Sequence, residues 1–186
     1  MEVKSRSLEL IENYTSYYGC VFFLSSHKKY KIKECIFDNC SFRTDVVFSQ
    51  IENCQFINCN FSNRFCLYPS STSGLLKEIG QLFSLTELDL SNTKIAELPI
   101  EICQLPSLTH LNLSDTEIKE LPKEIGQLSS LTHLNLSSTQ ITELPKEIRQ
   151  LSFLTYLRLD STNITEIPKE ITQLSFLIHL NLPSVP

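Results

Sequence analysis

The sequence has few of the residues and segments that several classes of function require. Only four glycines occur in 186 residues, so no glycine-rich loop is present to cradle a phosphate group. Lysine and arginine are not clustered and the net charge is -5, whereas nucleic-acid binding depends on many grouped cationic contacts. No stretch approaches the roughly 18 consecutive apolar residues that a membrane span needs. We therefore expect neither nucleic-acid nor membrane binding.

Signals for export and for disulfide bonding are also missing. The N-terminal segment MEVKSRSLELIENYT has no apolar core of the kind found in signal peptides. The seven cysteines are odd in number, and six of them lie between Cys20 and Cys66. This distribution predicts reduced thiols in a cytoplasmic protein rather than a disulfide framework.

The sequence contains no recognisable catalytic constellation. It shows no nucleophile placed with a general base, no paired carboxylates and no phosphate loop. We therefore predict a protein that is not an enzyme and that holds no cofactor and no metal.

The second part of the chain is an internal repeat. Four units of 23 residues follow one another without slippage: SLTELDLSNTKIAELPIEICQLP, SLTHLNLSDTEIKELPKEIGQLS, SLTHLNLSSTQITELPKEIRQLS and FLTYLRLDSTNITEIPKEITQLS. A fifth unit begins at Phe176, and Leu75 to Phe83 matches the second half of a unit.

Each unit combines a strand pattern with a helix pattern. The spacing L-x-x-L-x-L places Leu88 and Leu90 on one side of a short strand and leaves Glu87 and Asp89 facing outward. A proline and apolar residues at helical spacing follow, which predicts a short helix or a 3₁₀ turn. One unit cannot bury its leucines alone, so the units must stack.

These units resemble the leucine-rich repeat family, in particular the intracellular LPxxIxxL subtype of bacterial and plant proteins. The resemblance covers residues 75–186, about four to five units. It implies an α/β solenoid: a horseshoe arc with a parallel concave sheet and short convex helices. One departure is that threonine replaces the asparagine whose amide usually bonds the backbone of neighbouring turns, at Thr93, Thr116, Thr139 and Thr162. A hydroxyl has fewer donors than an amide, so we expect the same role with less strength.

The first part of the chain repeats small residues and phenylalanine at intervals of five. The pattern is clearest at Cys35/Phe37, Cys40/Phe42, Cys54/Phe56 and Cys59/Phe61. It resembles the pentapeptide-repeat family, which implies a β-helix with these side chains in a narrow core. We therefore divide the chain into a β-rich cap over residues 1–66, pentapeptide-like from about residue 20, a linker over 67–74 and the repeats over 75–186. The cap would cover the open N-terminal edge of the repeats.

Two alternatives for this chain remain open from sequence. Cys35-x4-Cys40 and Cys54-x4-Cys59 have spacings compatible with a structural zinc site in an N-terminal domain with a regulatory role. The alternative interpretation is that these cysteines are small buried core residues. It also explains why a phenylalanine follows each of them by two positions. The second alternative is a self-assembling structural protein, because the array ends at Leu180, Leu182 and Pro183 without a polar capping unit.

The outward strand positions form the predicted partner-binding surface. One column contains three histidines and a tyrosine at equivalent positions, which should stack at about 4.8 Å. Beside it lie a second column of polar residues and then a third with Ser91, Ser114, Ser137 and Asp160. Tyr156 and Arg158 are the expected anchors. The predicted binding residues are Glu87, Asp89, His110, Asn112, His133, Asn135, Tyr156, Arg158, Asp160 and His179.

The sequence thus predicts a binding module whose concave sheet holds a protein partner. The resemblance to bacterial repeat proteins, some of which are delivered into host cells, suggests an effector that acts on host proteins in the host cytosol. Self-association through the uncapped C-terminal end is the further partnership that the sequence suggests.

Overall fold

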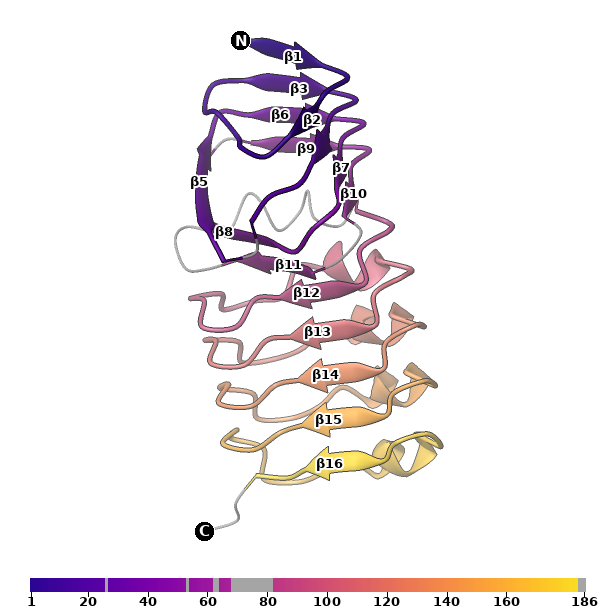
Figure 1. The fold of residues 1–186 in the computed structure, drawn as a ribbon. Coiled ribbons are helices and arrows are strands. Elements are labelled where there is room, and N and C mark those ends of the chain that lie inside the picture. Colours follow the sequence, from indigo (N-terminus) through magenta and orange to yellow (C-terminus); the bar gives the residue numbers. More distant parts are fainter. Residues whose placement is uncertain (26, 53, 62–63, 68–81, 184–186) are drawn as a thin grey trace.

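The computed structural model describes residues 1–25, 27–52, 54–61, 64–67 and 82–183. The chain is an elongated stack of short parallel strands, with the N-terminus at one end and β16 near the other (Figure 1). Within the described residues, no helix has the length and apolar character that crossing a membrane requires.

The described residues up to position 67 contain short strands that wind into stacked coils. They are β1 (Glu2–Lys4), β2 (Ser7–Leu8), β3 (Ser16–Tyr18), β4 (Val21–Phe22), β5 (Lys29–Lys33), β6 (Ile36–Asp38), β7 (Ser41–Phe42), β8 (Val46–Glu52), β9 (Gln55–Ile57), β10 (Asn60–Phe61) and β11 (Arg64–Leu67). Ser16 pairs in parallel with Ile36, and Ile36 with Gln55. Equivalent residues of successive coils are therefore 20 and 19 positions apart.

Aromatic rings fill the interior of these coils in two columns. Phe37 stacks on Phe56 with ring centroids 4.8 Å apart, and Phe42 stacks on Phe61 at 4.3 Å. The strand pleat explains this arrangement, because the residue two positions after each small residue points into the same narrow interior. The small residues are equally buried, and Cys35 has no exposed surface.

The turns between strands use left-handed backbone conformations. Gly19, Asn39 and Asn58 have φ values of 60°, 52° and 50°. Glycine and asparagine tolerate this region best, so the sequence places suitable residues at three coil corners.

The repeats alternate short strands with 3₁₀ helices. The elements are β12 (Glu87–Asp89), η1 (Ile102–Gln104), β13 (His110–Asn112), η2 (Lys123–Gln127), β14 (His133–Asn135), η3 (Lys146–Gln150), β15 (Tyr156–Arg158), η4 (Lys169–Gln173) and β16 (His179–Asn181). A proline with an extended backbone immediately precedes each of η2, η3 and η4. This confirms the predicted helix start, since proline is suited to the first turn.

A single sheet runs through both parts of the molecule. Its strand order is β16-β15-β14-β13-β12-β11-β8-β5, and Phe65 of β11 pairs with Leu88 of β12. The coils therefore cover the first repeat by strand pairing and share one hydrophobic core with it. Leu67 lies in β11, while residues 68–74 of the predicted linker and residues 75–81 of the predicted repeat lie outside the described residues.

The threonine ladder differs from the expectation. The hydroxyls of Thr93, Thr116 and Thr139 donate to the carbonyl oxygens of the residues three positions earlier, at 2.6, 2.8 and 2.7 Å. They close their own turn, and among the described residues they do not bond the neighbouring one. The prediction of bonds between turns at these positions was wrong, because the short threonine side chain reaches only its own backbone.

The four cysteines of the zinc alternative do not converge within the described residues. No group of three or more His, Cys, Asp or Glu side chains is placed to hold a metal there. Cys35 pairs with Cys54 in one column, where its N–H donates to Cys54 Sγ at 3.3 Å. The Cys59 thiol donates to the Phe37 carbonyl at 3.3 Å, so it belongs to a second column, with Cys40. The pleat thus separates the thiols that a zinc site would have to collect.

Candidate binding face

The predicted binding residues lie on the face of strands β12 to β16 that points away from the core. Parallel pairing places equivalent residues side by side. The aromatic column is defined as Glu87, His110, His133, Tyr156 and His179. The amide column is defined as Asp89, Asn112, Asn135, Arg158 and Asn181. We call the surface formed by both columns the open face.

The rings of the aromatic column stack along the sheet. Ring centroids of His110 and His133 are 4.1 Å apart with an interplanar angle of 15°. The distance from His133 to Tyr156 is 5.5 Å, and Tyr156 lies 5.7 Å from His179 with the rings tilted by 56°. The mean strand separation of about 4.8 Å sets this spacing, and ring rotation accounts for the deviations.

A ladder of threonine hydroxyls fixes the two stacked histidines. Thr109 Oγ1 donates to Thr86 O at 2.9 Å and lies 2.9 Å from His110 Nδ1. Thr132 makes the equivalent contacts with Thr109 O and His133 Nδ1. Each threonine hydroxyl has a single proton, which it donates to the carbonyl oxygen of the preceding repeat. The histidine Nδ1 must therefore donate its own proton to the threonine oxygen. In the neutral ring, Nε2 is then the nitrogen with a free lone pair.

The amide column is held by its own turns. Asn112 Oδ1 accepts the N–H of Ser114 at 3.2 Å, and Asn135 Oδ1 accepts the N–H and the hydroxyl of Ser137 at 3.1 and 2.8 Å. The oxygens are thereby occupied and the NH₂ groups remain as donors. Ser114 and Ser137 are buried, so the expectation that they face outward was wrong: they close the turn beneath the asparagines.

Arg158 and Asp160 form an ion pair on this face. Arg158 Nε and Nη2 donate to the two carboxylate oxygens of Asp160, each at 2.9 Å. The hydrogen bonds from Arg158 hold the pKa of Asp160 below its usual value. Much of the donor capacity of the predicted Arg158 anchor is therefore used within the chain, which the two-residue spacing of the pair could have indicated.

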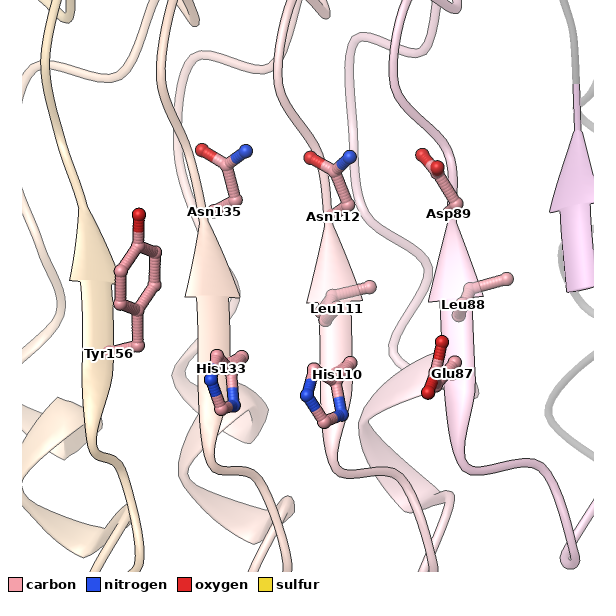
Figure 2. Close-up of a pocket in the computed structure, with 9 residues that line it drawn as sticks. All are labelled: Glu87, Leu88, Asp89, His110, Leu111, Asn112, His133, Asn135 and Tyr156. Carbon is pink, nitrogen blue, oxygen red and sulfur yellow. The ribbon is translucent and has the colours of Figure 1, made fainter. Parts of the chain in front are cut away.

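A depression of about 230 Å³ lies between the two columns (Figure 2). Leu88 and Leu111 lie at the strand centres, between the two rows of polar side chains. The lining residues are Glu87, Leu88, Asp89, His110, Leu111, Asn112, His133, Asn135 and Tyr156. The structure thus brings seven of the ten predicted binding residues together, and leaves Arg158, Asp160 and His179 outside the depression.

The electrostatics of the depression favour the neutral form of the His133 imidazole. Burial, followed by the neighbouring His110 ring, lowers the pKa of His133 below 6.5, while the carboxylate of Glu87 acts in the opposite sense. The nine residues that line the depression include no lysine and no arginine. Near neutral pH its formal charge therefore comes from carboxylates.

The functional contribution of Thr109, Thr132 and Thr155 was missed from sequence. They recur at one offset immediately before the strand residues, and this recurrence is the signal that could have found them. Their hydroxyls donate to the carbonyls of the preceding repeat at 2.9, 3.0 and 3.0 Å. These threonines provide the bonds between repeats that we had assigned to the turn threonines.

Comparison with known proteins identifies the repeats. The chain matches the family described as leucine-rich repeat region over residues 64–137 and 123–185, which together span more than half of its length. Among curated proteins, no sequence matches it.

Solved structures share the fold. A leucine-rich-repeat protein from Leptospira interrogans is 25% identical, with a TM-score of 0.48 over 88% of this chain and 52% of that one. An internalin from Listeria monocytogenes is 13% identical, with a TM-score of 0.53 over 92% and 67%. The leucine-rich-repeat ectodomain of the Arabidopsis thaliana receptor kinase GASSHO1/SCHENGEN3, solved in complex with Casparian strip integrity factor 2, is 20% identical, with a TM-score of 0.58 over 96% and 27%.

This chain therefore spans about half of the length of the Leptospira protein and a smaller part of the Arabidopsis ectodomain. The family match, the 23-residue period and the parallel sheet agree with one another. The chain belongs to the leucine-rich repeat proteins.

Proposed function

We propose that the chain is a protein-binding module that holds a protein partner on its open face and catalyses no reaction. The observation that supports this proposal is the preordered surface itself. Stacked rings and turn-bound amides meet around one depression, and the side chains are fixed before any partner arrives. Such preorganisation reduces the entropy cost of binding.

The composition of the open face is that of an interface. Its centre combines aromatic rings with leucine and asparagine, and its charged groups lie toward the two ends. Buried interface centres are depleted of charge and enriched in aromatic residues. The Arabidopsis ectodomain of similar fold was solved in complex with Casparian strip integrity factor 2, which supports a binding role here.

Finer features are part of the proposal. We assign the repeats to the intracellular LPxxIxxL subtype and the N-terminal coils to the pentapeptide type, on the residue patterns given above. Every described cysteine is buried and outside any disulfide bond, which suits a reducing compartment such as the cytoplasm. An effector that acts on host proteins fits a surface built for protein contact.

The test is an affinity capture with two matched double variants. Tyr156→Ala with His179→Ala removes two rings of the aromatic column. Among the described residues, neither side chain forms a hydrogen bond with the backbone, so the fold should tolerate their loss. Arg149→Ala with Gln173→Ala removes two exposed side chains from η3 and η4. Both variants are first compared with the wild type by thermal unfolding. Proteins bound from cell lysate are then quantified by mass spectrometry.

A partner captured by the wild type and by the helix variant, but not by the open-face variant, supports the proposal. A partner kept by the open-face variant and lost from the helix variant contradicts it. Light scattering on the same samples addresses self-assembly, since Phe176, Ile178 and Leu182 are exposed. Concentration-dependent oligomers without any captured partner would favour the self-assembling alternative.

A further inference from the structure

Charge is unevenly distributed over the open face. Its cation, Arg158, is bound by Asp160 through two hydrogen bonds, so that pair contributes no net charge. The two central repeats present only histidine and asparagine. At the β12 end, the carboxylate of Glu87 lines the depression.

Glu87 is the acidic group most available to a partner. Its side chain forms no ion pair with any side chain that the structure describes, and it is only half-buried. Figure 2 shows Glu87, His110 and His133 in one row along the lower side of the depression. A group that enters here meets a carboxylate followed by two stacked imidazoles.

The imidazoles add acceptors rather than donors to this row. Because Nδ1 of His110 and of His133 is engaged by a threonine hydroxyl, the remaining nitrogen of each neutral ring is Nε2, which accepts. The ring faces of His133 and Tyr156 also lie along the depression. Carboxylate, imidazole acceptors and aromatic faces match a planar cation with several N–H donors.

We infer that the depression receives the arginine side chain of a protein partner, with the guanidinium at Glu87 and His110 and the aliphatic stem between the aromatic and amide columns. This inference deepens the proposed function and rests on it. The volume of about 230 Å³ suits one long side chain. The arginine leaves its own water shell for a site that supplies a carboxylate, imidazole acceptors and aromatic ring faces, so it would be an anchor of the complex.

The test uses two short peptides that differ only in charge. Acetyl-Ser-Arg-Ser-amide is titrated into the whole chain, followed by the same peptide with citrulline in place of arginine. Citrulline keeps the shape and loses the positive charge. Binding is monitored by the ring C–H signals of His110 and His133 in NMR. We expect saturable shifts with arginine, with a dissociation constant on the order of 1 mM, and no saturation with citrulline.

Glu87→Gln supplies the second comparison and Glu97→Gln its control. Both substitutions remove one carboxylate from the same repeat, but Glu97 is exposed and does not line the depression. Arginine affinity should fall by about fivefold or more in Glu87→Gln and stay unchanged in Glu97→Gln. It should also decrease with added salt.

Equal binding of the two peptides, or unchanged affinity in Glu87→Gln, would overturn the inference. The peptide comparison needs no substitution, so it remains decisive even if a variant unfolds. Failure here is distinguishable from failure of the proposed function. If only the arginine inference fails, the Tyr156→Ala, His179→Ala variant still fails to capture a partner that the wild type binds. If the proposed function fails, no captured protein depends on the open face.

Discussion

The imidazole ring of His110 lies flat against that of His133, with ring centroids 4.1 Å apart and 15° between their planes. A proton added to one ring would place a positive charge on the face of the other. Tyr156, Glu87 and His179 are the other titratable groups near His133. Of these only Glu87 acts to raise its pKa, and burial and the neighbouring histidine prevail.

The pKa of His133 should therefore rise when its neighbour is replaced. His110→Gln removes the repelling imidazole and keeps a polar side chain of similar length, so the His133 titration should move upward toward 6.5. NMR titration of the His133 ring signals measures this directly. An unchanged or lower pKa in the variant would show that the rings are not coupled.

The lowered pKa of His133 also has a consequence for stability. The unfolded chain binds this proton near pH 6.5, whereas the folded chain binds it only at lower pH. Protons therefore favour the unfolded state as the pH falls from 7 through 6.5, and this part of the stability is lost on acidification. Unfolding by urea at pH 7 and pH 5 should show a smaller loss in His133→Gln than in the wild type. An equal loss in both proteins would exclude a contribution from His133.

Replacing Thr132 by valine should weaken the stack of repeats. Valine has the shape of threonine but cannot donate to Thr109 O, which lies 3.0 Å from the hydroxyl, and leaves His133 Nδ1 without its partner. A loss of about 1 kcal/mol in the free energy of unfolding is expected, and Thr132→Ser should recover most of it. Thr142→Val, at an exposed position, is the control and should change little. Nitrogen chemical shifts of His133 would report the tautomer in each protein.

Much of this architecture follows from the sequence because repetition amplifies weak local signals. Leu88 and Leu90 point inward in a pattern that recurs every 23 residues, so the strands, the 3₁₀ turns and the columns of outward residues were predictable. The period gives positions but not the direction of hydrogen bonds. The sequence could therefore not show that turn threonines bond their own turn while the threonines immediately before the strands bond the preceding repeat.

The sequence predicted which residues belong to the candidate site better than it predicted which of their side chains bond one another. Arg158 and Asp160 occupy adjacent columns, and their two-residue separation permits an ion pair that a column-by-column interpretation overlooks. The same limit applies to the cysteines. The five-residue spacing of Cys35 and Cys40 is compatible with zinc ligands, but only the three-dimensional path places them in separate columns with Cys54 and Cys59.

Within the N-terminal coils, substitutions in the aromatic interior should cause the largest loss of stability. Phe42 is fully buried between Phe22 and Phe61, at 4.8 and 4.3 Å between ring centroids. Phe42→Ala should cost about 3 to 5 kcal/mol in the free energy of unfolding, because it leaves a cavity in a rigid stack. Phe23→Ala is the matched control, since Phe23 is 49% exposed and should change stability by less than about 0.5 kcal/mol. Equal effects of both substitutions would show that the stack does not support the fold.

The buried thiols should be unreactive until the chain unfolds. Each described cysteine is buried, so the reagent cannot reach the sulfur atoms of the folded chain. This holds even for Cys35 and Cys40, where hydrogen bonding with Cys54 and Cys59 lowers the pKa to about 6 and about 7. Burial raises the pKa of Cys103 to about 12, so little of the reactive thiolate forms there near neutral pH. Alkylation with iodoacetamide should be slow in native buffer and should reach all seven cysteines in guanidinium chloride, as counted by mass spectrometry. Elemental analysis should find no stoichiometric zinc, and EDTA should leave the thermal midpoint unchanged. A bound zinc ion whose removal lowers that midpoint would require Cys35, Cys40, Cys54 and Cys59 to converge, and so would contradict the two-column arrangement.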